Sequence, residues 1–304
     1  MKPMWVVGID EAGYGPNLGP LVQAAVGLHL PDGDSAGWDS LRLTVRRTQD
    51  DTDDRLLIDD SKKVYTRYGF TALERGVHAG LGRPFNRVAD LLAELLLEAL
   101  VADLHQEAWF DGSESLPIES WERAEAALPS TAIRVSLVPS RRFNAITDRF
   151  DSKGAVLAKG VIDLMPEACR GAAAGESVLF LCDKQGGRNF YAAMLHEAFP
   201  DGWVVVERES AAESRYRIEG LDRPVAVVFR PRADGDSVTV ALASMVCKYL
   251  REVCMKQFNR FWAKHVPGIA PTAGYPGDSR RFYELIRPAM AKLGLTEDQV
   301  WRKR

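Results

Sequence analysis

Short apolar runs recur along the chain, and most of them have the composition of β-strands. β-branched and aromatic residues without a polar break are typical of strands buried on both faces, whereas strict alternation is typical of half-buried strands. These patterns predict strands over residues 4–9, 20–31, 132–138, 177–182, 202–208 and 224–230. The first of them, MWVVGI, runs directly into two adjacent acids, Asp10 and Glu11.

Longer segments between the strands place apolar residues at helical spacing. Residues 85–106 do so throughout, which predicts an amphipathic helix. A second helix is predicted over residues 152–165, ending at Pro166, because proline disrupts a helix interior. A third covers residues 236–262, and its first half is apolar on nearly every face, which indicates burial. Strands interleaved with helices predict an α/β core with a mixed sheet.

The chain shows no obvious division into separate domains. No internal repeat, low-complexity tract or clean interdomain linker is present, so residues 1–304 are expected to form one domain. Residues 82–130 and 185–225 are expected to be insertions or elaborations on its core. Roughly residues 255–304 are expected to form a C-terminal helical segment packed against that core.

Composition and charge exclude several classes of protein. The 304 residues, 46% of them hydrophobic, provide ample material for one large core, and no apolar run reaches the length of about eighteen residues that spans a membrane. The first apolar stretch is too short for a secretory signal, and the four cysteines form no C-x-x-C pair, so a cytoplasmic protein is expected. A formal net charge of −3 argues against indiscriminate nucleic-acid binding but allows a local basic groove.

Acidic residues stand where predicted elements begin or end. Asp10 and Glu11 end the first predicted strand, and Asp183 ends the strand predicted over residues 177–182. Asp234 lies just ahead of the long helix. Binding sites in α/β sheets gather at strand ends. Phosphoryl transfer by two metal ions requires such a group of carboxylates, and Mg²⁺ favours a few carboxylates with water and phosphate oxygens. Because adjacent strand residues point to opposite faces, Asp10 is the better candidate for a central ligand.

Structural roles also fit several of these acids. Asp234, Asp236 and Ser237 are all suited to cap the long helix. A single aspartate after a strand, such as Asp183, is usually a turn residue. Asp111, in WFDGSES, has the same local pattern. Composition and spacing alone do not separate a catalytic acid from a cap or a turn.

Several motifs, in the same order, resemble those of type 2 ribonucleases H, the ribonuclease HII family. GIDEAGYGPNLGP (8–20) resembles the family's Asp-Glu-Ala-Gly segment with its following Gly-Arg-Gly and Gly-Pro, and DDSKKVY (59–65) resembles its Asp-Ser-Lys segment. LFLCD (179–183) is similar to the strand that ends in the third family carboxylate. Residues 232–252 resemble the segment with the fourth carboxylate and the Ala-Ser-x-x-x-Lys-x-x-Arg-Asp pattern, and AGYPGD (273–278) resembles the late Gly-Tyr-Pro motif.

The resemblance implies an RNase H-like fold: a mixed central sheet flanked by helices, with inserted elaborations. It implies hydrolysis of the RNA strand of RNA·DNA hybrids, or cutting at ribonucleotides embedded in duplex DNA, with 3′-hydroxyl and 5′-phosphate products. Two Mg²⁺ or Mn²⁺ ions would take part. The metal ligands carried over are Asp10, Glu11, Asp183 and Asp234, with Asp236 as the alternative fourth. The substrate-binding residues carried over are Gly13, Tyr14, Gly15, Lys62, Lys63 and Tyr275.

Some positions depart from the family pattern. Tyr14 replaces the arginine of Gly-Arg-Gly, Glu252 replaces an aspartate, and Arg232 replaces a lysine. The departure at Tyr14 bears on the choice between long hybrids and single ribonucleotides. Two alternatives to the hybrid-cleaving enzyme stay open: another RNase H-fold nuclease acting on DNA or structured substrates, and a non-catalytic protein that binds RNA·DNA hybrids. In each case the expected partner is nucleic acid, with no membrane association, and the expected state is a monomer.

Overall fold

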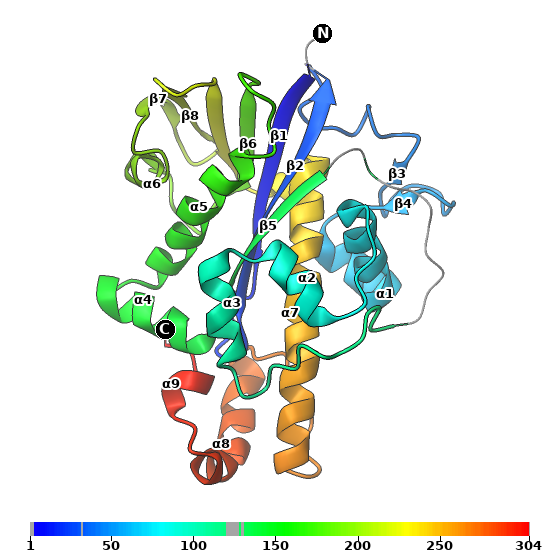
Figure 1. Ribbon diagram of the computed structural model, residues 1–304, viewed down its shortest axis with the longest axis vertical. Helices are drawn as coiled ribbons and strands as arrows, with labels where there is room; N and C mark the ends of the chain where they lie inside the picture. The colour runs from blue at the N-terminus through cyan, green and yellow to red at the C-terminus, as the bar shows by residue number, and fades with distance from the viewer. Residues whose placement is uncertain (1–2, 32, 120–127, 129–130, 304) are drawn as a thin grey trace.

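A seven-stranded mixed sheet forms the centre of the computed structural model, which describes residues 3–31, 33–119, 128 and 131–303. The strand order is β5-β2-β1-β6-β9-β8-β7 (Figure 1). The strands are β1 (Pro3–Ala12), β2 (Leu21–Pro31), β5 (Thr131–Val138), β6 (Val178–Asp183), β7 (Trp203–Glu209), β8 (Ser214–Glu219) and β9 (Val225–Arg230). A separate small sheet pairs β3 (Val45–Arg46) with β4 (Leu56–Leu57).

The sheet is parallel at its centre and antiparallel at both edges. β1, β6 and β9 run in parallel, whereas β2 and β5 on one side, and β8 and β7 on the other, pair antiparallel. All six predicted strands are therefore confirmed, and so is the mixed sheet. β8 was not predicted, because its apolar residues Tyr216 and Ile218 alternate with arginines. Its inward positions are buried and its outward positions carry charge, as on the surface of a half-exposed strand.

Helices cover both faces of this sheet. The long helix α7 (Val238–His265) and α1 (Ser61–Leu81) lie on one face, and α5 (Lys153–Cys169) and α6 (Ala192–Ala198) cover the other (Figure 1). α4 (Ser140–Phe150) lies beside α5. At the far end of the molecule, α8 (Pro276–Leu293) and α9 (Glu297–Val300) bring the chain terminus back beside α4 (Figure 1). None of the helices in the described ranges is long and apolar enough to span a bilayer.

Alternation along β1 divides its side chains between two cores. Val6 packs in the core under α7, whereas Val7 and Ile9 pack in the core under α5. Gly8 lies between them, where an added Cβ would stand 2.2 Å from the backbone of Thr239. Only glycine therefore allows α7 to approach the strand this closely. The close approach brings the middle of α7 over the end of β1.

The predicted helix over residues 85–106 is in fact two helices, α2 (Val88–Leu95) and α3 (Glu98–His105). Between them the backbone of Leu96 bridges Val135, and the Leu97 N–H donates to the Val135 carbonyl at 3.1 Å. β5 is an edge strand, and the break in the helix satisfies its free edge. Leucine at three consecutive positions hides this break, because each suits a helix equally well.

The helix predicted to end at Pro166 continues to Cys169. Proline removes one backbone N–H from the helix, a loss of about 3 kcal/mol or more in an isolated helix interior. Here Met165 and Ala168 are buried against the sheet, and the Ala168 carbonyl accepts a hydrogen bond from the Trp5 indole at 2.9 Å. These tertiary contacts outweigh the local cost and extend the helix by three residues.

Two expected elaborations contain regular structure. Residues 82–130 include α2 and α3, and residues 185–225 include α6, β7 and β8. β7 and β8 extend the main sheet, whereas α2 and α3 lie against β5. That these segments are insertions, and that residues 255–304 form a separate C-terminal helical unit, stay predictions.

Candidate active site

The end of β1 is the base of a cleft between the sheet and α7. Asp10 is 9% exposed, and its carboxylate accepts the Glu11 N–H at 2.8 Å. Its backbone carbonyl accepts a hydrogen bond from the Cys247 thiol of α7 at 3.2 Å. The strand continues for two residues beyond Asp10, to Ala12, so both acids lie within the last residues of the strand rather than after its end. Both acids are thereby fixed by regular backbone structure.

Asp183 lies next to these acids because β6 is the parallel neighbour of β1. Ile9 pairs with Cys182, so Asp10 and Asp183, which follow them, lie at the same end of the two parallel strands. The Asp183 carboxylate accepts the Ala233 N–H at 3.2 Å, which ties it to the short 3₁₀ helix η1 (Ala233–Gly235). That helix carries Asp234. One hydrogen bond therefore ties Asp183, the third predicted acid, to the short helix that carries Asp234, the fourth.

The cleft has a volume of about 260 Å³ and contains every predicted site residue except Lys63. It is lined by Asp10, Glu11, Gly13, Tyr14, Gly15, Lys62, Asp183, Asp234 and Tyr275, together with Ala12, Asp60, Ser61, Ser244, Lys248 and Arg251. Asp236 lies outside it and is exposed; its backbone N–H donates to the Ala233 carbonyl at 3.0 Å, and its carbonyl accepts from the Trp38 indole at 3.2 Å. Between the two alternatives for the fourth acid, the geometry thus favours Asp234.

The four carboxylates are in an environment that disfavours their charge. Burial, and then the neighbouring Glu11 charge, hold the pKa of Asp10 well above its ordinary value. Burial and the charge of Asp183 raise the pKa of Glu11 to about 7, against the opposing effect of Lys62. Burial also raises the pKa of Asp183, and burial with the charge of Asp60 raises that of Asp234. A cation placed among these groups would relieve their repulsion and desolvation.

The two glycines beside Tyr14 have different reasons to be glycine. Gly13 has φ +90°, and a Cβ there would lie 2.7 Å from the Pro20 carbonyl oxygen and 2.9 Å from the Arg251 side chain. Gly13 is therefore required by the backbone conformation and by packing. Gly15 has no such constraint, because a Cβ there would meet only the Tyr275 ring at 3.8 Å.

Tyr14 is half-buried, with its ring beside a cation. Lys153 at the start of α5 places its ammonium 4.5 Å from the ring centroid. Burial raises the pKa of the Tyr14 hydroxyl, and the Arg188 charge partly opposes the rise. The loop residue that differs from the family pattern thus has positive charge next to it, supplied by other segments of the chain. Tyr275, across the cleft, is 51% exposed.

The lysine pair at the start of α1 divides between two roles. Asp60 caps this helix, its carboxylate accepting the N–H groups of Lys62 at 2.7 Å and Lys63 at 3.4 Å. The Lys62 side chain lines the cleft, whereas the Lys63 ammonium lies 3.8 Å from the Asp59 carboxylate. The structure therefore brings Lys62, and not Lys63, into the cleft.

Asp111 is a turn residue. Its carboxylate accepts both the N–H and the hydroxyl of Ser113, at 3.0 and 2.6 Å, as in an Asx-turn. The sequence pattern alone did not distinguish Asp111 from Asp183. The structure does, because Asp183 lines the cleft and Asp111 does not.

Comparison with solved structures identifies the architecture. Bst-RNase HIII in complex with Mn²⁺ matches with a TM-score of 0.50 and 13% identity, covering 98% of this chain and 66% of that one. The chain has an RNase H-like fold. The ribonuclease H2 from Pyrococcus horikoshii OT3 gives a TM-score of 0.47 at 16% identity, covering 98% and 92% of the two chains. RNase HII in the PCNA complex from Archaeoglobus fulgidus gives 0.43 at 14%, covering 99% and 94%. No family model and no curated protein matches the sequence.

This RNase H-like fold also brings residues to the cleft that sequence reasoning did not single out as site residues. Ser244, Lys248 and Arg251 follow one another on α7 at intervals of four and three, which places them on one helix face. The Ser244 hydroxyl donates to Ser61 at 2.9 Å, and Lys248 pairs with Glu252 at 2.5 Å. The available signal was the Ala-Ser-x-x-x-Lys-x-x-Arg pattern, which the resemblance linked only to the fourth carboxylate.

The donor set of the cleft suits a hard divalent cation. Carboxylate oxygens are its main metal-ligating groups, and two lysines and an arginine also line it. Within the described ranges, no three or more His, Cys, Asp or Glu side chains lie close enough together to form a ready-made cage. Mg²⁺ usually takes one or two carboxylates and completes its shell with water and substrate phosphate. An open group of carboxylates therefore fits such an ion bound together with a substrate.

Proposed function

We propose that this chain is a divalent-metal-dependent endoribonuclease of the type 2 ribonuclease H class. Its substrates are RNA·DNA hybrids, duplex DNA with an embedded ribonucleotide, or both. The observation that carries the proposal is the convergence of four carboxylates, from three separate segments, in one cleft where burial raises the pKa of each. Acids that served only as caps or surface turns would lie apart and in water.

In this proposal Asp10, Glu11, Asp183 and Asp234 hold Mg²⁺ or Mn²⁺. The ions, when bound, supply positive charge to the phosphodiester and activate a water for in-line attack, leaving a 3′-hydroxyl and a 5′-phosphate. The protein's own contribution is to fix the acids by backbone structure. Asp10 is fixed by β1 and by the Cys247 thiol, and Asp183 by the Ala233 N–H.

The border of the cleft supplies groups for the substrate. Lys62 offers a cation to a phosphate, and the exposed ring of Tyr275 offers a surface for a sugar or a base. Among the described residues, the backbone N–H groups of Tyr14 and Gly15 have no hydrogen-bond acceptor. Such donors suit a 2′-hydroxyl or a phosphate oxygen, and the 2′-hydroxyl is the group that distinguishes RNA from DNA.

A cleavage panel tests the proposal. The full chain is incubated with an RNA·DNA hybrid, a DNA duplex containing one ribonucleotide, and an all-DNA duplex, each with Mg²⁺ or Mn²⁺ and with chelator. Cleavage that requires both a metal ion and a 2′-hydroxyl is expected. Asp183→Asn should lower the rate by a factor on the order of 10²–10³, with unfolding still cooperative.

Each other outcome has a definite meaning. Equal cutting of all-DNA substrate would replace the proposal with a DNA nuclease of the same fold. Binding of the hybrid without turnover in Mn²⁺ would identify a hybrid-binding protein. Asp111→Asn is the matched control, because this aspartate has the same local sequence pattern as Asp183 but lies in a turn outside the cleft; it should keep full activity.

A further inference from the structure

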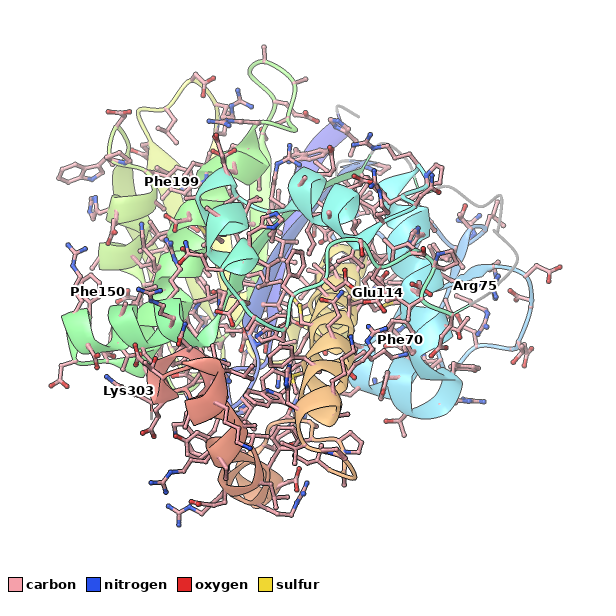
Figure 2. The ribbon with its side chains drawn as sticks, turned by 60° about the horizontal axis from the view of Figure 1, so that its bottom comes forward. Phe70, Arg75, Glu114, Phe150, Phe199 and Lys303 are labelled. Carbon is pink, nitrogen blue, oxygen red and sulfur yellow. The ribbon has the colours of Figure 1, made fainter. Side chains whose placement is uncertain are left out.

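The end of the chain lies directly against the loop that follows β1. Trp301 bridges Leu18, the Arg302 N–H donates to the Asn17 carbonyl at 2.8 Å, and the Asn17 side-chain amide donates to the Arg302 carbonyl at 3.3 Å. Figure 2 shows Lys303 beside α4, where its ammonium contacts Asp148 at 2.5 Å. Residues far apart in sequence are thus held together by both backbone and side-chain contacts.

The Arg302 side chain is an unusual buried cation. It is 1% exposed, and its Nη2 donates to the carbonyl of Gly13 at 2.6 Å and to that of Pro16. Its guanidinium lies 4.7 Å from the ring centroid of Phe143. Nε and Nη1 have no hydrogen-bond partner, and no carboxylate in the described part of the chain pairs with it. Burial and the charge of Arg251 lower its pKa to about 9, so the site disfavours the cation.

Arg251 binds the same loop from the other side. It is 3% exposed and donates to the carbonyls of Pro20 at 2.5 Å, Leu18 at 3.2 Å and Ala273 at 3.0 Å. Two buried guanidinium groups therefore hold carbonyl oxygens of residues 13–20. A buried charge without an ionic partner is strongly unfavourable, so bonds to carbonyls alone are a weak reason to keep two of them.

We propose that Arg302 is a positioning residue for the nucleic-acid strand, which fixes the Gly13–Pro16 loop and provides an uncompensated positive charge beneath it. In a trans peptide the carbonyl and the following N–H point in opposite directions. Holding the Gly13 carbonyl on the Arg302 side therefore turns the Tyr14 N–H away from the guanidinium. The loop that Arg302 holds contributes Gly13, Tyr14 and Gly15 to the cleft, where the anionic substrate of the proposed function would lie. This inference rests on that proposed function.

The variants that test it are Arg302→Met, which keeps length without charge, and Arg302→Lys. Arg223→Met is the matched control, because Arg223 also donates to three backbone carbonyls, those of Cys169, Ala172 and Ala173, but lies outside the cleft. Binding of the hybrid duplex is measured in chelator over a range of salt, Mn²⁺ binding by calorimetry, KM and kcat by cleavage, and loop order by amide hydrogen exchange.

Arg302→Met is expected to weaken duplex binding by about tenfold, to raise KM with kcat changed far less, and to lower the salt slope by about one. Mn²⁺ affinity should stay near that of the unaltered chain, and exchange of the amides at 14–18 should accelerate while β6 and β9 keep their protection. Arg302→Lys should restore the salt slope but only part of the loop protection, because lysine cannot span two carbonyls with one planar group. Arg223→Met should change none of these.

Unchanged duplex binding and unchanged loop exchange in Arg302→Met would overturn the inference. So would a parallel loss of Mn²⁺ affinity and of protection throughout the sheet, since that pattern belongs to a purely structural arginine. If the unaltered chain neither binds nor cleaves any duplex of the panel, the proposed function fails and the proposed role of Arg302 toward nucleic acid fails with it. If the unaltered chain cleaves the hybrid and the Arg302 variants bind and cleave it equally well, the proposed function stands and the inference alone fails.

Discussion

Replacement of Glu11 by glutamine should stabilise the protein when no metal ion is bound. Burial and the neighbouring Asp183 charge raise the pKa of Glu11 from 4.5 to about 7. Between these two values the folded state binds a proton that the unfolded state has lost, so this group makes the free energy of unfolding fall as the pH rises through the window. Each pH unit of separation corresponds to about 1.36 kcal/mol. The loss approaches about 3 kcal/mol at pH 8, and glutamine does not suffer it.

The assay is urea unfolding of both proteins in chelator from pH 5 to pH 8. The Glu11→Gln protein is expected to be the more stable at pH 8, by about 1–3 kcal/mol, with the difference shrinking toward pH 5. Adding Mn²⁺ at pH 8 should stabilise the unaltered chain more than the variant, because the ion replaces the missing positive charge. Glu197→Gln, an exposed glutamate on α6, is the control and should show no such pH dependence.

A Glu11→Gln protein that is less stable than the unaltered chain at pH 8 in chelator would refute this reasoning. It would mean that the carboxylate is stabilised by its surroundings and that the acids do not repel one another in the folded state. A constant difference across the pH range would point instead to a change in packing. Only a difference that grows with pH supports repulsion among ionised carboxylates.

Three further predictions concern separate features. Gly13→Ala should destabilise the fold by about 1–3 kcal/mol, because φ is +90° and the added Cβ would lie 2.7 Å from the Pro20 carbonyl oxygen. Gly15→Ala should change thermal unfolding little. Equal losses of stability in the two variants would contradict this distinction. Burial raises the pKa of Glu107 to about 7, so stability should fall as pH rises from about 4.5 to 7, and Glu107→Gln should flatten that profile in urea unfolding. Lys153→Met should raise KM for the hybrid more than it lowers kcat, as the ammonium 4.5 Å from the Tyr14 ring supplies charge near the loop; an unchanged KM and salt dependence would exclude this role.

The apolar pattern was sufficient to place the strands that form the middle of the sheet. Buried strands such as β1 and β6 are nearly continuous in β-branched and aromatic residues, so their burial is visible in the sequence. β8 was missed because Arg215 and Arg217 occupy its outward positions. The break between α2 and α3 was missed because it depends on the free edge of β5, which is more than thirty residues away in sequence. Local pattern carries no information about such an edge.

The same limit explains what was found and missed in the candidate site. That Asp10 and Asp183 lie together follows from two strands whose ends can be read, once those strands are parallel neighbours. Asp234 rather than Asp236 follows from η1, a turn held by the Asp183 carboxylate, which no spacing rule specifies. A carboxylate and a partner that meet only in three dimensions are beyond the reach of local patterns.

Buried arginines are the least predictable part of the site, and they alter how its charge should be understood. Arginine is normally a surface residue, so nothing in the local sequence indicates that Arg251 and Arg302 are buried. Yet acids with raised pKa values lie near the Gly13–Pro16 loop, and two buried guanidinium groups donate to backbone carbonyls in and next to that loop. In the metal-free protein both sets are unfavourable. On the proposed function, a metal ion bound to the acids and a phosphodiester lying over the loop would relieve both together, so a metal-bound nucleic-acid strand would complement both kinds of buried charge.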